Sequence, residues 1–189
     1  MPIDENGIGT GDYTELKFQH LEKILEMHLA ITRSVMNKNR SRFYQTYRYI
    51  DATAGCGMYI DGMLGSPIRF LERAERFKIN YRADFIEQNP ININKLKELI
   101  ESKATHEGWQ IANLHYHDDC YQAVLPTLLV SRDFRELGLL FVDPTGSLPH
   151  FDIIALTAKQ RPRMDILLYI STTNVKRLYQ TTHTLLRII

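Results

Sequence analysis

The chain has 189 residues, of which 44% are hydrophobic and 24% are charged, as in ordinary soluble globular proteins. This length suits one domain with a sizeable core and leaves little room for a second. The formal net charge of +1 provides no strong overall field to attract nucleic acid or an anionic membrane. No apolar run approaches the length of a membrane span, so we expect no membrane association.

The two cysteines, Cys56 and Cys120, lie far apart and form no CxxC pair. A disulfide scaffold is therefore not expected, and a reducing compartment fits best. The polar N-terminus lacks the basic and apolar regions of a signal peptide. We predict a cytoplasmic protein with a flexible leader over residues 1–13 and a single domain over residues 14–189.

In chain order, apolar periodicity predicts a long amphipathic helix over residues 14–38 and then an alternation of strands and helices. We expect the strands at residues 49–53, 83–87, 113–117, 137–142 and 165–170. The helices between them begin at Ser66, as N-cap, at Asn89-Pro90, at Tyr121 (interrupted by Pro126) and at Phe151. A last helix is expected over residues 175–189. This alternation predicts an α/β fold, a Rossmann-like doubly wound parallel sheet in the order 3-2-1-4-5, with the ligand at the carboxyl ends of the strands.

The segment YIDATAGCGMY is the sharpest motif. An apolar strand ends in Asp51, and Gly55 and Gly57 allow a tight turn with close backbone approach to a ligand. A third glycine near Ile60, expected of the dinucleotide fingerprint, is absent. Glu87 ends the second strand, where a carboxylate can accept hydrogen bonds from both ribose hydroxyls. The alternative for the glycine segment is a purely structural turn, and the alternative for Glu87 is a solvated glutamate at the end of a strand.

Asp118-Asp119 follows the third strand, where Asp119 is placed to meet an adenine amino group. His115, His117 and Cys120 lie nearby, but no second ligand pair stands at metal spacing, so we predict no metal site.

Asp143-Pro144 follows the apolar strand LGLLFV. Asp143 and a neighbouring carbonyl can hydrogen-bond a substrate amino group and aim its lone pair at an electrophilic methyl group. The alternative is that Asp143 only caps the following helix.

Basic and aromatic residues alternate between Lys38 and Arg48. Such a stretch can hold a phosphate backbone and stack bases, although we favour a solvated linker. Cys56 has no histidine close in sequence, so we interpret it as a small apolar filler.

The sequence resembles the three-Cys-motif partner proteins. The likeness is carried by YIDATAGCGMYIDGMLGSP, FIEQNP and FVDPTGSLPHFDIIALTAKQRPRMDILLYISTTNVKR. It implies a Rossmann-like methyltransferase fold with a cofactor site at Asp51, Gly55, Gly57 and Glu87. Members look like relatives of amino-group methyltransferases, whose fourth motif reads Asp/Asn-Pro-Pro-aromatic. Here the motif is DPTG, which lacks the second proline and the aromatic residue. We expect the domain to lack the C-terminal strand hairpin that is usual in methyltransferases of this type.

These motifs predict a methyltransferase that uses S-adenosylmethionine and acts on an amino nitrogen in nucleic acid. The residues assigned to the cofactor are Asp51, Gly55, Gly57, Glu87 and Asp119, and those assigned to the acceptor are Asp143 and Pro144. The alternative is a non-catalytic protein that binds S-adenosylmethionine or a nucleotide as partner of another enzyme. The apolar edge strand predicts a homodimer through residues 165–189, unless a different protein takes that place.

Overall fold

The computed structural model describes residues 12–38, 46–133, 135–145, 147–172 and 174–176. Five parallel strands form one sheet in the order β3-β2-β1-β4-β5, which is the predicted order. The strands are β1 (Tyr47–Asp51), β2 (Tyr81–Ile86), β3 (Leu114–His117), β4 (Leu137–Val142) and β5 (Met164–Leu168). The helices are α1 (Asp12–Lys38), α2 (Ser66–Phe77), α3 (Pro90–Glu107), α4 (Tyr121–Leu128) and α5 (Phe151–Gln160).

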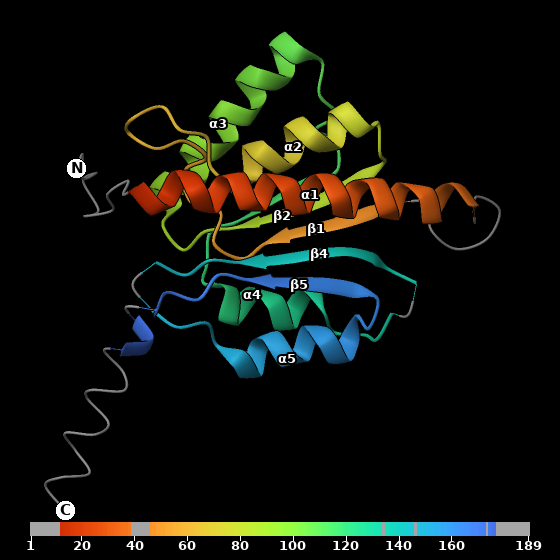
Figure 1. Cartoon of the computed structure of the whole chain (residues 1–189), viewed down its shortest axis with the longest axis vertical. Helices are drawn as coiled ribbons and strands as arrows, with labels where there is room; N and C mark the ends of the chain where they lie inside the picture. Colours follow the sequence, from red (N-terminus) through yellow and green to blue (C-terminus); the bar gives the residue numbers. More distant parts are fainter. Residues whose placement is uncertain (1–11, 39–45, 134, 146, 173, 177–189) are drawn as a thin grey trace, which may run out of the picture.

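Helices cover both faces of the sheet: α1, α2 and α3 lie on one face, and α4 and α5 lie on the other (Figure 1). The alternation of side chains along each strand produces this arrangement. Tyr49 and its odd-numbered neighbours belong to the core cluster beneath α1, α2 and α3. Ile50 and its even-numbered neighbours pack with α4 and α5. Each face of the sheet thus carries a cluster of apolar side chains. Helices bury both faces, as expected of a parallel sheet.

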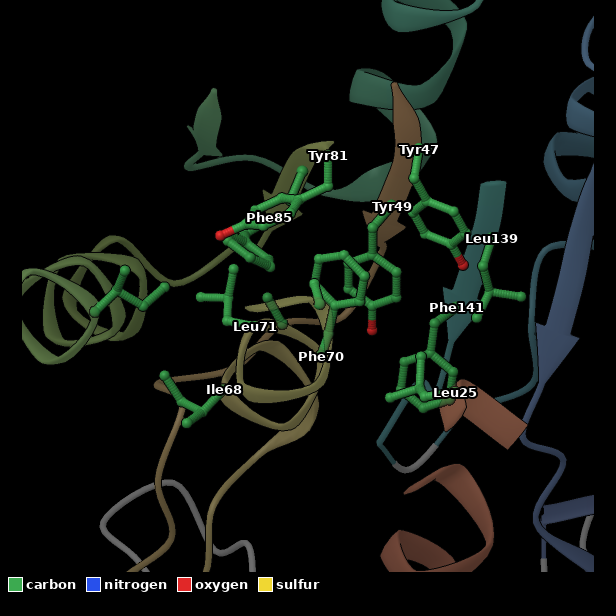
Figure 2. Close-up of a cluster of buried hydrophobic side chains, with 14 of the residues drawn as sticks. Leu25, Tyr47, Tyr49, Ile68, Phe70, Leu71, Tyr81, Phe85, Leu139 and Phe141 are labelled. Carbon is green, nitrogen blue, oxygen red and sulfur yellow. The ribbon is translucent and has the colours of Figure 1, made fainter. Parts of the chain in front are cut away.

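Aromatic rings dominate the core beneath α1 and α2. Figure 2 shows Phe70 of α2 lying against Tyr49 of β1, and the two rings stack with centroids 3.9 Å apart. Tyr81 and Phe85 reach the same cluster from β2. Offset or stacked aromatic pairs add roughly 0.5–1.5 kcal/mol beyond the area that they bury, so this cluster fixes the position of α2 on the sheet.

Helix α1 is bonded both to α2 and to the sheet. Glu22 forms an ion pair with Arg69 and with Arg73 of α2, the latter at 2.7 Å. His28 bridges two strands: its Nε2 lies 2.8 Å from Asp165 of β5, and its Nδ1 lies 2.8 Å from the hydroxyl of Tyr47 of β1. The helix runs alongside the strands of the sheet, next to α2 (Figure 1).

Several predicted boundaries were wrong. Strands β1 and β5 begin earlier than expected and end at Asp51 and Leu168. The predicted strands also include the turn residues 52–53 and the loop residues 169–170. The N-cap of α2 is Gly65, with an extended backbone, and not Ser66. Ser66 is instead the first helical residue, and its hydroxyl hydrogen-bonds Asp51.

Other predictions fall on residues outside this description. The leader was predicted over residues 1–13, but α1 already begins at Asp12. Residues 1–11 of this leader lie outside the described residues. The same holds for residues 177–189, most of the helix predicted over residues 175–189. Among the described strands, β5 lies at an edge of the sheet, as the dimer prediction assumed.

Candidate functional site

The loop after β1 starts as a continuation of the sheet. The amide of Ala52 donates to the carbonyl of Phe141 at 2.9 Å, and that of Ala54 donates to the carbonyl of Ile86 at 2.9 Å. These bonds hold the loop between the carboxyl ends of β4 and β2. Gly55 and Gly57 then adopt φ values of +63° and +80°, the left-handed region that glycine enters at least cost.

The two glycines have different surroundings. A β-carbon built on Gly55 meets nothing within 4 Å, so this residue faces open space. A β-carbon on Gly57 would lie 2.6 Å from Cδ1 of Leu96 and 3.2 Å from Cδ2 of Leu99. Gly57 therefore permits close packing of the loop on α3, whereas Gly55 leaves its side of the loop accessible to a ligand.

Asp51 ends β1 with a fully buried carboxyl group. It accepts hydrogen bonds from the hydroxyl of Tyr49 and from the amide of Thr53, both at 3.2 Å. Burial raises its pKa to about 7 although these bonds and one from Ser66 lower it, and the charge of Asp143 raises it further. Asp51 is thus partly protonated near neutral pH, which limits the negative charge held at this position.

Glu87 follows β2 and joins two loops. Its Oε2 accepts the amide of Gly55 at 3.0 Å, and its Oε1 accepts the amide of Asn89 at 2.9 Å. Asn89 in turn caps α3 by accepting the amide of Ile91, so the position of Glu87 is fixed by the loop after β1 and by the start of α3.

A pocket of about 190 Å³ opens at this carboxyl edge of the sheet. Among the residues that line it are Thr53, Glu87, Asp119, Cys120, Gln122 and Pro144. The structure therefore brings together three residues that the sequence predicted, Glu87, Asp119 and Pro144. The pocket lining does not include four other predicted residues, Asp51, Gly55, Gly57 and Asp143. Two of them bond to residues that do line it: the amide of Gly55 donates to Glu87, and that of Asp143 donates to Thr53.

Gln122 is a lining residue that the sequence did not single out. Its Oε1 is buried and has no hydrogen-bond partner within the described residues. A buried polar atom without a partner is costly and is rare in native proteins. The amide of Gln122 is thus an acceptor available to a ligand in the pocket. Asp119 lies beside it, at the start of α4, and accepts the amide of Cys120 at 2.7 Å.

Asp143 does not cap the following helix, since the N-cap of α5 is His150. Its amide donates to Oγ1 of Thr53 at 2.9 Å, and its carboxylate accepts from Nζ of Lys17 at 2.6 Å. The side chains of Lys17 and Asp143 are 15% and 18% exposed. Sequence reasoning missed Lys17 because 126 residues separate it from its partner and no local pattern links the two.

His117 is held by Asp84, a fully buried residue of β2, at 3.0 Å. Asp84 also forms an ion pair with Arg48 of β1 at 2.7 Å. Within the described residues no group of three or more metal-ligating side chains occurs. His117 thus belongs to a hydrogen-bonded network with Asp84 and Arg48.

Three sequence features remain: the basic and aromatic stretch, Cys56 and the expected lack of a membrane span. Residues 39–45 of the basic and aromatic stretch fall outside the described residues. Cys56 donates its thiol hydrogen to the carbonyl of Met58, with the sulfur and oxygen 3.0 Å apart. Among the helices of the described ranges, none is both long enough and apolar enough to cross a membrane.

Comparison with known proteins supports the fold. No known family model and no curated protein matches the sequence. Among solved structures, a protein of Legionella pneumophila is similar with a TM-score of 0.52 at 14% identity, over 86% of this chain and 72% of that one. At this identity the likeness concerns the fold alone, and it agrees with the Rossmann-like order of the sheet.

Two further solved structures are similar at lower scores. A precorrin 8W decarboxylase of Methanobacterium thermoautotrophicum has a TM-score of 0.49 at 12% identity, over 98% of this chain and 77% of that one. An rRNA methylase of Streptococcus thermophilus has a TM-score of 0.44 at 12% identity, over 82% of this chain and 72% of that one.

The strand order and the pocket at the carboxyl edge together define this chain as a Rossmann-like α/β domain with a candidate ligand site.

Proposed function

We propose that this protein binds S-adenosylmethionine and transfers its methyl group to an amino nitrogen. The observation that carries the proposal is the chemistry of the pocket at the carboxyl edge of the sheet. Two carboxylates, Glu87 and Asp119, line it, and no lysine or arginine is among the described residues that line it. Such a pocket favours a ligand that is positively charged and rich in hydrogen-bond donors.

The donor and acceptor set fits this cofactor. The carboxylate of Glu87 can accept hydrogen bonds from ribose hydroxyls, and Asp119 can accept from an adenine amino group. Oε1 of Gln122 has no hydrogen-bond partner in the described part of the chain and offers a further acceptor. Gly55 leaves open space beside the loop, where the backbone can approach a ligand closely.

The same chemistry disfavours a phosphorylated nucleotide. Phosphate groups are normally held by arginine, lysine or converging backbone amides, whereas the lining residues here are acidic or neutral. The third glycine of the dinucleotide motif is also absent. These points support S-adenosylmethionine over the nucleotide that the sequence left as an alternative.

When bound, the cofactor supplies a methyl group on a positively charged sulfur. The contribution of the chain is to orient an acceptor. The backbone amide of Asp143 bonds to Thr53, and Thr53 and Pro144, the next residue, line the pocket, so Asp143 adjoins the pocket. An ionised carboxylate accepts a hydrogen bond from an amino group and can take a proton from it.

The identity of the acceptor was predicted as nucleic acid, but nothing in the described residues supports that class in particular. We therefore limit the proposal to an amino nitrogen. Membership of the three-Cys-motif partner family is part of the proposal and rests on the sequence motifs YIDATAGCGMYIDGMLGSP and FIEQNP.

A second candidate function is non-catalytic binding of the same cofactor by a partner protein of another enzyme. The ion pair between Lys17 and Asp143 favours it, because the carboxylate assigned to the acceptor is already engaged. The departure of the fourth motif, Asp143-Pro144-Thr145-Gly146, points the same way. Binding is common to both functions, and only transfer separates them.

Calorimetric titration with S-adenosylmethionine, S-adenosylhomocysteine and ADP tests the binding site. We expect binding of the first two and not of ADP. Glu87→Gln should weaken binding about tenfold or more, since hydrogen bonds to charged groups contribute roughly 1.5–3 kcal/mol. Glu98→Gln is the matched control, because Glu98 is exposed on α3 and does not line the pocket. Equal affinities in the two variants would reject the site.

Transfer is tested with labelled cofactor and pools of DNA, RNA and protein. Asp143→Asn keeps the shape of the side chain and removes the proton acceptor, so transfer should fall about 100-fold or more. Binding without transfer to any pool or to the protein itself would assign the chain to the non-catalytic function.

A further inference from the structure

The carboxylate assigned to the acceptor already holds an amine. Nζ of Lys17, in the second turn of α1, donates to Oδ2 of Asp143 at 2.6 Å. Both side chains are largely buried, at 15% and 18% exposure. This is the position in which an acceptor nitrogen would have to lie if Asp143 orients it.

Aromatic rings enclose the same ammonium group. Nζ of Lys17 lies 4.9 Å from the ring centroid of Phe18 and 5.1 Å from that of Tyr169. Tyr169 is held beside the end of β4 by its amide, which donates to the carbonyl of Val142 at 2.9 Å. Aromatic faces bind ammonium groups and their methylated forms alike. The surroundings of Lys17 therefore suit an amine before and after methylation.

The ion pair between Lys17 and Asp143 adjoins the pocket assigned to the cofactor, although neither residue is among those that line it. Asp143 is joined through its amide to Thr53, and Thr53 and Pro144 both line the pocket assigned to the cofactor. The amine of Lys17 is therefore hydrogen-bonded to Asp143, the residue that adjoins the pocket wall.

We propose that Lys17 is a methylation site of this protein, modified by its own chain. The inference rests on the proposed function and names its acceptor as the primary amine of a lysine. Asp143 accepts a proton from Nζ, and the freed electron pair forms the new N–C bond to the methyl group. The C–S bond breaks, and its electron pair stays on sulfur, which changes from a sulfonium to the thioether of S-adenosylhomocysteine. The proton then passes from Asp143 to solvent.

Lys23 of the same helix provides an internal comparison. It is an exposed lysine of α1, and the ion pair with Asp143 is made by Lys17 alone of the two. General reactivity of surface amines would modify Lys23 at least as readily as the largely buried Lys17. Selective modification of Lys17 thus requires the arrangement around Asp143.

The first experiment incubates the full chain with S-adenosylmethionine and maps methyl groups on its peptides by mass spectrometry. We expect methylation of Lys17 and none of Lys23, at a rate per molecule that does not depend on protein concentration. Lys17→Arg keeps a cation for Asp143 but should abolish the signal, and Asp143→Asn should reduce it about 100-fold.

Binding is measured on the same samples so that the possible failures can be told apart. If the cofactor binds and Lys17 stays unmodified, this inference is overturned and the proposed binding function stands. Methylation of Lys23 to the same extent also overturns it. If the cofactor does not bind at all, the proposed function fails, and the inference fails with it.

A second experiment needs no transfer and reports whether Nζ lies near the sulfur. A positive sulfonium is repelled by a nearby ammonium, whereas the neutral thioether of S-adenosylhomocysteine is not. Lys17→Met should therefore tighten S-adenosylmethionine binding about tenfold relative to S-adenosylhomocysteine, and Asp143→Asn should shift the ratio the other way. An unchanged ratio in both variants would mean that the ion pair only fastens α1 to the sheet.

Discussion

Gly57 and Gly55 differ in what a single methyl group would meet, and this difference predicts different losses of stability. Both residues have positive φ, so replacement of either by alanine costs about 1–2 kcal/mol of backbone strain. At Gly57 the new β-carbon would also lie 2.6 Å from Cδ1 of Leu96. Leu96 is fully buried and cannot move away without disturbing the core.

The additional loss at Gly57 follows from overpacking. Extra carbon atoms in a well-packed core cost about 1–3 kcal/mol, which adds to the strain. We expect Gly57→Ala to lower the free energy of unfolding by roughly 2–5 kcal/mol in total. Gly55→Ala should lower it by only about 1–2 kcal/mol, because its β-carbon meets nothing within 4 Å.

Urea denaturation followed by circular dichroism measures both variants. The midpoint should fall for each, and by more for Gly57→Ala, with an unchanged slope if the transition remains two-state. Ligand binding should respond in the opposite order. Gly55→Val fills the open space of the loop and should abolish cofactor binding while the sheet stays folded. Equal destabilisation by the two alanine variants would refute the assigned packing of the loop on α3.

Three further predictions concern pH, the helix α1 and assembly. The folded-state pKa of Asp51 is raised from 3.8 to about 7, so the unfolded chain releases this proton first. The free energy of unfolding should therefore decrease as pH rises from about 4 to about 7. Asp51→Asn should flatten this dependence on pH. The same dependence in the variant would contradict the raised pKa of Asp51. Tyr47→Phe leaves Nδ1 of His28 without its partner and should cost about 1 kcal/mol in urea titration, whereas no loss would mean that water replaces the hydroxyl. We also propose a homodimer through residues 165–189, and light scattering that gives the 22.0 kDa monomer mass would exclude it.

The order of the sheet could be predicted because it depends on local signals. Apolar strands such as residues 137–142 alternate with helices that begin at proline, as in Asn89-Pro90. Right-handed crossovers then allow few arrangements, and the order 3-2-1-4-5 is confirmed. Boundaries were less predictable, since Asp51 ends β1 while Ala52 still hydrogen-bonds to β4.

The candidate site was predictable only as a set of residues at one edge. Strand ends identify Glu87, Asp119 and Pro144, and the structure places all three around one pocket. Their relative roles depend on neighbours that are distant in sequence. Gly57 faces Leu96 of α3, and Gln122 has an acceptor atom without a partner; neither property leaves a trace in local sequence.

The sequence by itself determined the fold class, because the period of apolar residues and the turn residues act over a few positions along the chain. Tertiary structure alone decided which charges meet. Lys17 reaches Asp143 only because packing brings the second turn of α1 to the carboxyl end of β4. Asp51 has a raised pKa only because the folded core removes it from water. Electrostatic energies depend on distance and burial in three dimensions, and these quantities are set by packing.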